Sequence, residues 1–257
     1  MDEVAGTRAP AYSVMTECLR RFDATGDRNA LQRAFGARPM ADTDMNWYRG
    51  ALGELHVARL LERLGTEWRV LHSLQFAGAD TDVDHIVIGP TGVYCLNTKN
   101  HSGQKVWVGG SRILVNGQKT DHIRASKSEA KKLQRELDRL GAPVSITAVL
   151  VIVDPARMTL RESPEDVRVV TSRALVGWLR RRHRLLTAEQ IQWLADRLDA
   201  SPTWETAPLD GSEVKARFER LDRLVRQARF VRVSWLAAFT LAAIGTAVVV
   251  AFSALAR

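Results

Sequence analysis

The feature of this sequence that most constrains its fold is a run of 24 residues, positions 233–256, without a charged side chain: VSWLAAFTLAAIGTAVVVAFSALA. A helix of ~20 apolar residues is long enough to cross the hydrocarbon core of a bilayer. The alternative is a buried helix of a soluble core, but such helices are usually shorter and apolar on one face only. We therefore predict one membrane-spanning helix at 233–256.

A series of six arginines, one at every third position, precedes this run: Arg217, Arg220, Arg223, Arg226, Arg229 and Arg232. Only Arg257 follows the run, so the positive-inside rule predicts a single-pass protein of the cell membrane with a cytoplasmic N-terminal part. Steps of three place successive arginines about 60° apart around a helix, which distributes them over its circumference. This arrangement favours attraction to anionic lipid along 217–232. A solvated, charge-rich linker is the alternative.

The overall charge says little about partners. The chain has 37 Lys and Arg against 29 Asp and Glu, a net charge of +8, and residues 211–232 alone contain seven basic and three acidic side chains. Because much of the excess lies beside the predicted span, it is weak evidence for nucleic-acid binding. The two cysteines, Cys18 and Cys95, fit no zinc-binding spacing, so we expect reduced, buried thiols. The acidic N-terminus does not resemble a secretory signal.

Hydrophobic periodicity predicts the elements of the globular part. Helices are expected at 12–22, 44–64, 122–140, 172–183 and 186–199, with a loop at 24–39. Strands are expected at 68–75, 83–88, 93–98, 105–108, 112–115, 146–153 and 167–170, the last at a sheet edge. The helix at 122–140 lies between two groups of strands, so it is a natural crossover in an α/β fold with a mixed sheet.

These elements divide the chain into five segments. We expect an N-terminal helical extension at 1–43, a core domain at 44–155, a strand and helices packed on the core at 156–200, a linker with a basic juxtamembrane helix at 201–232, and the span at 233–256. The core segment is where polar residues interrupt the apolar pattern, and there we look for chemistry.

Three polar features stand out in the core segment. The motif GALGE at 50–54 puts two glycines inside a helix, at about 1 kcal/mol each relative to alanine, which indicates close packing beside Glu54. Asp84 shares a strand face with Asp82, and Asn97 shares one with Lys99 at the end of the next strand. If these strands pair antiparallel through the turn at 90–92, Asp84 comes to lie opposite Asn97 or Lys99.

A carboxylate, a second oxygen ligand and a lysine at a strand end suit metal-dependent chemistry on a phosphate. Hard oxygen ligands hold Mg²⁺ or Mn²⁺. The ion activates water and neutralises charge in the transition state, and a nearby lysine orients the water or stabilises the developing negative charge.

The stretch 47–137 resembles the NERD (nuclease-related) domain, a branch of the PD-(D/E)xK nuclease superfamily. The matching motifs come in order with consistent gaps: GALGE (50–54), VLHSL (70–74), VDHIVIGPTGVYCLNTKNHSG (83–103), ILVNG (113–117) and SEAKKL (128–133). The resemblance implies a restriction-endonuclease-like αβββαβ core and a DNA-processing nuclease. It implies a catalytic site at Glu54, Asp84, Asn97 and Lys99. Several members of the family carry membrane segments.

Position 97 departs from the superfamily pattern, because Asn97 stands where an acid is expected. Its amide oxygen can bind Mg²⁺ but brings no charge, so metal affinity and activity are open to question. The resemblance implies Asp84, Asn97 and Glu54 as metal ligands, with Glu54 restoring a second carboxylate and the Thr98 carbonyl as a further ligand. Some NERD sequences carry a similar asparagine, so the substitution fits a subgroup as well as a decayed site.

Five residues are candidates for contact with the substrate: His101, Lys105, Ser126, Arg180 and Arg181. Ser126, Ser128 and Glu129 are interpreted first as residues that start a helix, and only second as groups near the site. The basic run at 180–184 is as well explained by a solvated helix end as by contact with phosphates. His85 points away from the Asp84 face, which favours a packed or hydrogen-bonded histidine over a metal ligand.

Three functions stay open on the sequence alone. The first is a membrane-tethered nuclease that hydrolyses nucleic acid, DNA in preference. The second is a catalytically silent nucleic-acid-binding or scaffold domain, in which Asp84 and Lys99 form a structural ion pair and Glu54 is a solvated helix acid. The third is a membrane-associated signalling or stress protein with a protein partner.

Overall fold

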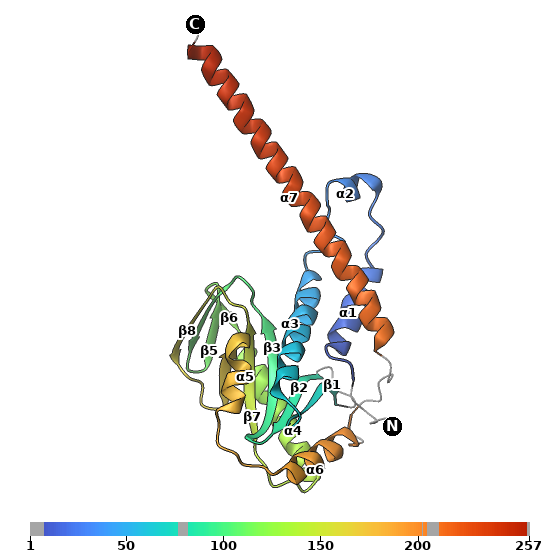
Figure 1. The fold of residues 1–257 in the computed structure, drawn as a ribbon, viewed down its shortest axis with the longest axis vertical. Coiled ribbons are helices and arrows are strands. Elements are labelled where there is room, and N and C mark those ends of the chain that lie inside the picture. The colour runs from blue at the N-terminus through green and yellow to red at the C-terminus, as the bar shows by residue number, and fades with distance from the viewer. Residues whose placement is uncertain (1–7, 77–81, 202, 205–210, 256–257) are drawn as a thin grey trace. The chain divides into compact units, whose positions relative to one another are not determined.

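The computed structural model describes residues 8–76, 82–201, 203–204 and 211–255 of the chain. It divides into two compact units, one made of Met1–Met15 and Trp47–Ser212 and the other of Thr16–Asn46 and Glu213–Arg257. The first unit contains all the β-strands that are described, arranged in two sheets (Figure 1).

The larger sheet of the first unit has five strands in the order β1-β2-β3-β7-β9. Their bounds are β1 Arg69–Gln75, β2 Asp82–Gly89, β3 Gly92–Asn100, β7 Ile146–Val153 and β9 Val167–Thr171. The first three strands pair antiparallel, whereas β3, β7 and β9 run parallel. The mixed sheet and the edge position of 167–170 are as predicted.

Helices cover both faces of this sheet. Their bounds are α3 Met45–Leu61, the 3-10 turn η1 Glu62–Leu64, α4 His122–Arg139, α5 Ser172–Arg180 and α6 Ala188–Asp199. Apolar residues of α3 and α5 pack with Leu96 and Val151 on one face, and those of α4 and α6 pack with Cys95 and Leu150 on the other. The alternating residues of β3 and β7 therefore serve two cores, which explains why these strands are apolar throughout.

A smaller sheet of four strands extends the same unit, in the order β6-β5-β4-β8. Its strands are β4 Lys105–Gly109, β5 Arg112–Val115, β6 Gln118–Thr120 and β8 Arg157–Glu162. β4 and β8 pair in parallel and follow directly on β3 and β7, so both chain segments pass from the first sheet to the second at the same end. The αβββαβ core order is confirmed, with this sheet as an addition.

Several predicted boundaries need correction. β6 and β8 were not predicted, because QKT has no apolar residue and RMTLRE has only two, neither of them β-branched or aromatic. The helix expected at 172–183 ends at Arg180, since the amides of Leu185 and Leu186 donate to the Pro90 carbonyl at 2.6 and 3.1 Å. The stretch 24–39, predicted as a loop, contains α2 Ala30–Ala34, which is started by a capping box between Asn29 and Gln32.

The second unit contains α2, most of α1 Tyr12–Asp23, and α7 Ser212–Leu255. α7 is one unbroken helix of 44 residues, whereas the sequence suggested a juxtamembrane helix and a separate span. Neither proline nor glycine stands near position 232, so nothing in the sequence breaks the helix there. Phe218, Leu221 and Ala228 are buried on its first part.

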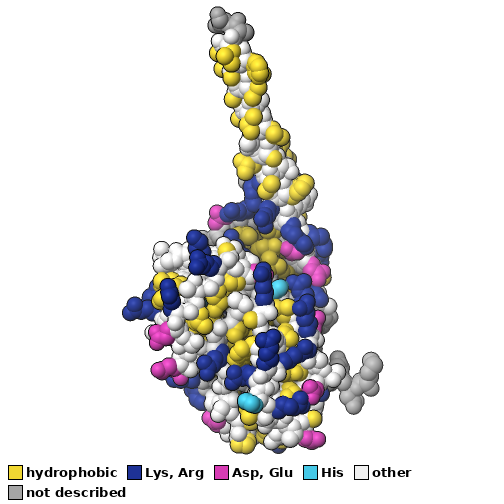
Figure 2. Space-filling model, turned by 60° about the vertical axis from the view of Figure 1, so that its left-hand side comes forward, with side chains coloured by type: hydrophobic (Ala, Val, Ile, Leu, Met, Phe, Trp, Pro, Cys, Tyr) yellow, Lys and Arg dark blue, Asp and Glu magenta, His cyan; other side chains and the backbone are white. Residues whose placement is uncertain are grey.

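The second part of α7 is long and apolar enough to cross a membrane. It contains an 18-residue window with a mean hydropathy of 2.1, and none of that window is buried against the rest of the protein. Figure 2 shows this stretch with hydrophobic side chains and without Lys or Arg, which begin below it. Ala256, the last residue of the predicted span, lies outside the described residues.

Candidate functional site

The candidate site lies where β2 and β3 meet at the end of their paired region. His85 faces Leu96 in the antiparallel register, which brings Asp84 level with Asn97. The Asp84 carboxylate accepts a hydrogen bond from the backbone N–H of Thr98. Strand alternation therefore predicted this pairing correctly, and the contact fixes the orientation of the Asp84 carboxylate.

Asn97 makes its contact with helix α4. Its Nδ2 atom donates to both carboxylate oxygens of Glu129, at 2.6 and 2.5 Å, and both side chains are buried. The carboxylate missing from position 97 thus stands beside it, on α4. Of the two interpretations of Glu129, the structure favours the group near the site over the helix-start residue. Glu129 lies beyond the first turn of α4, on its buried face.

Helix α3 brings Glu54 to the same place. Gly53 packs so closely on the end of β3 that a Cβ atom there would lie 3.0 Å from the Asn100 Cβ, and Asn100 Nδ2 donates to the Arg49 carbonyl at 2.7 Å. The predicted reason for a glycine beside Glu54 is therefore confirmed for Gly53. At Gly50, by contrast, an added Cβ would meet one Val14 methyl group at an ordinary 3.4 Å.

Burial and mutual repulsion raise the pKa of three carboxyl groups here. Desolvation, followed by the negative charge of Asp84, raises the pKa of Glu129 to about 7. Desolvation likewise raises the pKa of Asp84 to about 6 and that of Glu54 well above its usual value, the latter with a further contribution from Asp84. Burial penalises each charge, and the acids repel one another. The cluster formed by Glu54, Asp84, Asn97, Lys99 and Glu129 therefore attracts either protons or a cation.

Lys99 supplies positive charge to this cluster. Its ammonium group acts against desolvation on all three carboxyl groups, lowering the pKa of Glu54, Asp84 and Glu129. Lys99 is half-buried at the end of β3, two residues beyond Asn97. When all three acids are ionised, the single positive charge of Lys99 does not balance their negative charge.

Two buried oxygen atoms of the cluster lack a hydrogen-bond partner: Glu54 Oε2 and Asn97 Oδ1. Such orphaned acceptors are costly to bury, and a cation would satisfy both. Among the described residues, no three His, Cys, Asp or Glu side chains form a ready-made metal centre. The donors therefore fit a hard cation only if amide and backbone oxygens complete its coordination.

Comparison with known families decides what this arrangement belongs to. Residues 49–153 match the model of the family described as the nuclease-related domain. The chain contains a nuclease-related domain. The match spans α3 to β7 and so includes all the residues of the cluster.

One curated relative and the solved structures complete the comparison. An uncharacterized protein of Bacillus anthracis is 40% identical over 68 residues, which is 25% of this chain and 31% of the relative. The chain thus matches about a third of that protein's length. No solved structure matches the chain.

The structure brings the four predicted catalytic residues of the nuclease-related domain together, and adds Glu129. A signal for Glu129 was present in the sequence, since the buried positions of α4 recur at helical spacing: Ser126, Glu129, Ala130, Leu133, Glu136 and Leu137. A buried acid needs a polar partner, and for Glu129 that partner is Asn97. The assigned roles of all these residues stay predictions.

The predicted substrate contacts have different surroundings. His101 Nε2 lies 2.9 Å from His122 Nε2, and Ser126 is fully buried one helical turn before Glu129 with an unpartnered hydroxyl. Arg180 donates to the Arg63 carbonyl, so it has a structural role at η1. Contact of these residues with a substrate stays a prediction.

His85 is packed rather than exposed to the site, as expected. Its Nδ1 lies 2.8 Å from Nδ1 of His72, directly opposite on β1, and the rings meet edge to face. Burial lowers the pKa of His72 to about 4 and that of His85 well below its usual value. Both imidazoles are therefore neutral at physiological pH, one donating and the other accepting.

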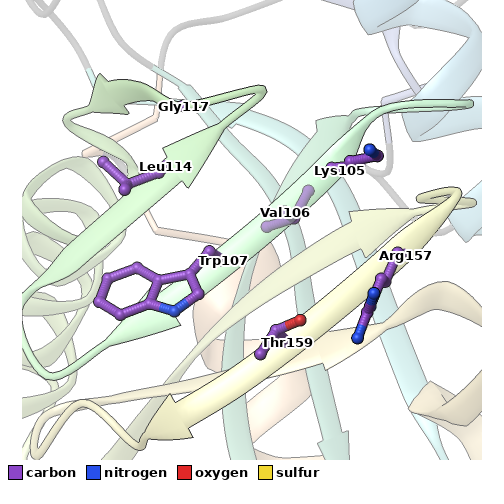
Figure 3. A pocket seen from close by; sticks show the side chains of 7 residues that line it. All are labelled: Lys105, Val106, Trp107, Leu114, Gly117, Arg157 and Thr159. Carbon is purple, nitrogen blue, oxygen red and sulfur yellow. The ribbon is translucent and has the colours of Figure 1, made fainter.

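A shallow hollow of about 230 Å³ lies on the outer face of the smaller sheet, beyond the cluster (Figure 3). Trp107 lines it, with Lys105 and Arg157 at neighbouring positions of the parallel strands β4 and β8. The indole lies flat on the sheet because Gly109 has no side chain there; a Cβ would come within 2.2 Å of the ring. Lys105, a predicted substrate contact, is thus beside an aromatic platform.

Proposed function

We propose that the nuclease-related domain hydrolyses phosphodiester bonds of nucleic acid, DNA in preference, with the help of Mg²⁺ or Mn²⁺. The observation that carries this proposal is the cluster of three buried carboxyl groups with raised pKa values, set beside Lys99 and two unpartnered oxygen atoms. Buried acids with raised pKa values beside a lysine are characteristic of functional sites, and a bound cation would favour their charged forms.

The chain's residues take distinct roles in the proposed reaction. Asp84 and the unpartnered oxygens of Glu54 and Asn97 would hold the cation, which when bound supplies a Lewis acid for the phosphate and an acidified water. Glu129 would be a positioning residue, because its contact with Nδ2 holds the Asn97 amide in place and leaves Oδ1 without a protein partner. Lys99 would stabilise the negative charge that develops on the phosphate oxygens.

Two features outside the cluster support a polyanionic substrate. Lys and Arg side chains are spread over the face of the globular part shown in Figure 2, away from the basic stretch of α7. The Trp107 platform offers a flat aromatic surface to a base while Lys105 and Arg157 can contact phosphates. β4 begins five residues after Asn100, so the platform follows the cluster closely in the sequence.

We further propose that the apolar part of α7 anchors the chain in the membrane. The uncharged run after Arg232 would span the bilayer, and the arginines before it would place the nuclease-related domain in the cytoplasm by the positive-inside rule. The same arginines would attract anionic lipid, although Arg217 and Arg226 already pair with Asp23 and Asp222.

A silent nucleic-acid-binding domain is the second candidate function. Asn97 favours it, because a neutral amide takes the place of a charged ligand and lowers metal affinity. The two candidates make different predictions: both bind nucleic acid, but only the nuclease cleaves it.

The test measures cleavage of labelled DNA and RNA by the full chain in detergent, with Mg²⁺, Mn²⁺ or chelator. We expect Lys99→Ala and Asp84→Asn each to lower the rate about 100-fold or more, as removal of transition-state stabilisation does elsewhere. Lys131→Ala and Glu165→Gln change exposed residues of like charge and serve as matched controls. Metal-independent cleavage, or cleavage that survives both site substitutions, would refute the proposal. Binding without cleavage would establish the silent domain.

A further inference from the structure

The segment around α2 is fixed to α7 at the level where its charged residues end. Trp235 Nε1 donates to the Ala34 carbonyl at 2.8 Å, and Arg232 Nη1 donates to the Gly36 carbonyl at 3.0 Å. Phe35 packs against Trp235 with 5.2 Å between ring centroids. All three contacts join the short α2 segment to residues on either side of position 233, where the uncharged run begins.

The fit of this segment on α7 is close enough to require a glycine. Gly36 has a φ of +67°, and a Cβ there would lie 2.5 Å from the Ala228 carbonyl oxygen and 2.8 Å from the Arg232 amide nitrogen. The backbone of the segment therefore lies directly on the backbone of α7. The segment moves with α7 and keeps its level along the helix.

The outer side of this segment presents large apolar side chains. Leu31 on α2 is 70% exposed, and Phe35, the C-cap of α2, is 52% exposed. Trp235 and Phe239 continue the apolar surface along α7, with stacked rings 5.6 Å apart. The surface is thus continuous with the proposed membrane span.

Basic side chains outnumber acidic ones around these apolar residues. Arg28, Arg33 and Arg38 lie in the segment, whereas Asp27 and Asp42 flank it and Asp42 pairs with Arg38. Arg28 is used internally, donating to the Ala37 carbonyl at 2.8 Å, whereas Arg33 is exposed on α2, two residues after Leu31. Apolar side chains together with exposed cations are the combination that binds the interface of an anionic bilayer.

We infer that residues 28–38 form a second membrane contact, in which Leu31 and Phe35 insert among the lipid headgroups of the bilayer that α7 spans. The aromatic pair of Phe35 and Trp235 lies at the depth where aromatic belts occur, and Arg33 meets lipid phosphate. The contact makes α7 and the α2 segment a two-point anchor, which restricts rotation of the helix about its axis. This inference rests on the proposed anchoring by α7.

The inference is tested by placing an environment-sensitive fluorophore at single introduced cysteines. The native thiols, Cys18 and Cys95, are both buried and leave exposed labelling sites unambiguous. Leu31→Cys and Phe35→Cys report the segment, Thr43→Cys is an exposed control in the same unit, and Gly245→Cys reports the span. The full chain is reconstituted at one copy per nanodisc, in phosphatidylcholine with phosphatidylglycerol.

We expect blue-shifted emission at 31 and 35 and at least a twofold loss of intensity when the lipids carry a headgroup-level spin label. The label at 43 should stay water-like, and the label at 245 should respond to a quencher deep in the acyl chains. Water-like emission at 31 and 35 with a quenched 245 would overturn the inference while leaving the anchoring intact. An unquenched 245 would overturn both. A blue shift that depends on two copies per disc would instead assign the surface to a second chain.

Discussion

Replacing Asn97 by aspartate tests the contact that distinguishes this site. The change puts a carboxylate where the Nδ2 atom now lies 2.6 and 2.5 Å from the oxygens of Glu129. If both groups stayed charged, their repulsion would amount to roughly 6 kcal/mol at an effective dielectric constant of about 20. A shared proton avoids most of that cost, as in other carboxylate pairs.

The pKa of Glu129 sets the size of the remaining effect. Because that pKa is about 7, protonating Glu129 at pH 8 costs about 1.4 kcal/mol. Loss of one of the two donated hydrogen bonds brings the expected destabilisation to about 2 kcal/mol without metal. For a domain of this size, that corresponds to a fall in Tm of roughly 4–8 °C. Near pH 6 Glu129 is already protonated, so the protonation cost falls away and only the loss of the hydrogen bond, about 0.6 kcal/mol, should remain.

The assay is thermal unfolding of the full chain in detergent, followed by tryptophan fluorescence at pH 6 and pH 8, with chelator or Mg²⁺. Adding Glu129→Gln to Asn97→Asp exchanges the donor and acceptor, so we expect the double variant to regain most of the lost Tm. Mg²⁺ should raise the Tm of Asn97→Asp more than that of the parent chain, since it neutralises the added charge. Asn29→Asp keeps a helix cap and serves as the control.

Two results would refute this reasoning. The first is an Asn97→Asp variant as stable as the parent chain at pH 8 in chelator. The second is a double variant less stable than either single one, because the two changes would then be independent losses rather than a restored pair.

Three further predictions concern single features of the fold. The pKa of Glu129 is raised to about 7, so the folded parent chain loses stability as pH rises from about 4.5 to about 7. Glu129→Gln has no such group, and its stability relative to the parent chain should therefore grow over this interval. Denaturation in chelator at several pH values checks this, and a constant difference would contradict it. Trp107→Ala should weaken single-stranded DNA binding about tenfold in a cleavage-deficient background, measured by anisotropy, whereas the exposed Trp193→Ala should not. Gly53→Ala should lower both the Tm and the cleavage rate, because the cost of overpacking exceeds the gain in helix propensity by about 1 kcal/mol. Gly50→Ala has room for its Cβ and should be neutral or stabilising. Equal effects of the two substitutions would contradict the packing of α3.

The strands and helices that form the core could be predicted because their sequences contain a clear apolar period. β7, with the sequence ITAVLVIV, has the predicted bounds, and β2 and β3 end within two residues of prediction. β6 and β8 could not be predicted, because their sequences are polar and their pairing depends on neighbours distant in sequence. The change in composition at position 232 divides the basic stretch from the predicted span, and the backbone of α7 continues through it as one helix.

The same distinction holds for the candidate site. Asp84, Asn97 and Lys99 follow from strand alternation and one tight turn, both of which are local properties of the chain. The contact between Asn97 and Glu129 crosses 32 residues and depends on how α4 rotates on the sheet. Periodicity shows that Glu129 lies on the buried face of α4, but only the packed structure shows which group it meets.

The His72–His85 pair has a consequence for how the chain responds to acidity. Because burial lowers the pKa of His72 to about 4, protonation disfavours the folded state, and stability worth about 3 kcal/mol is lost as pH falls from about 6.5 to about 4. The carboxyl cluster has the opposite slope over nearly the same interval, since its raised pKa values make the folded state lose stability as pH rises. Without a cation the two slopes oppose each other. A bound cation would remove the slope of the acids and leave that of the histidines, so that the chain would become more sensitive to mild acid.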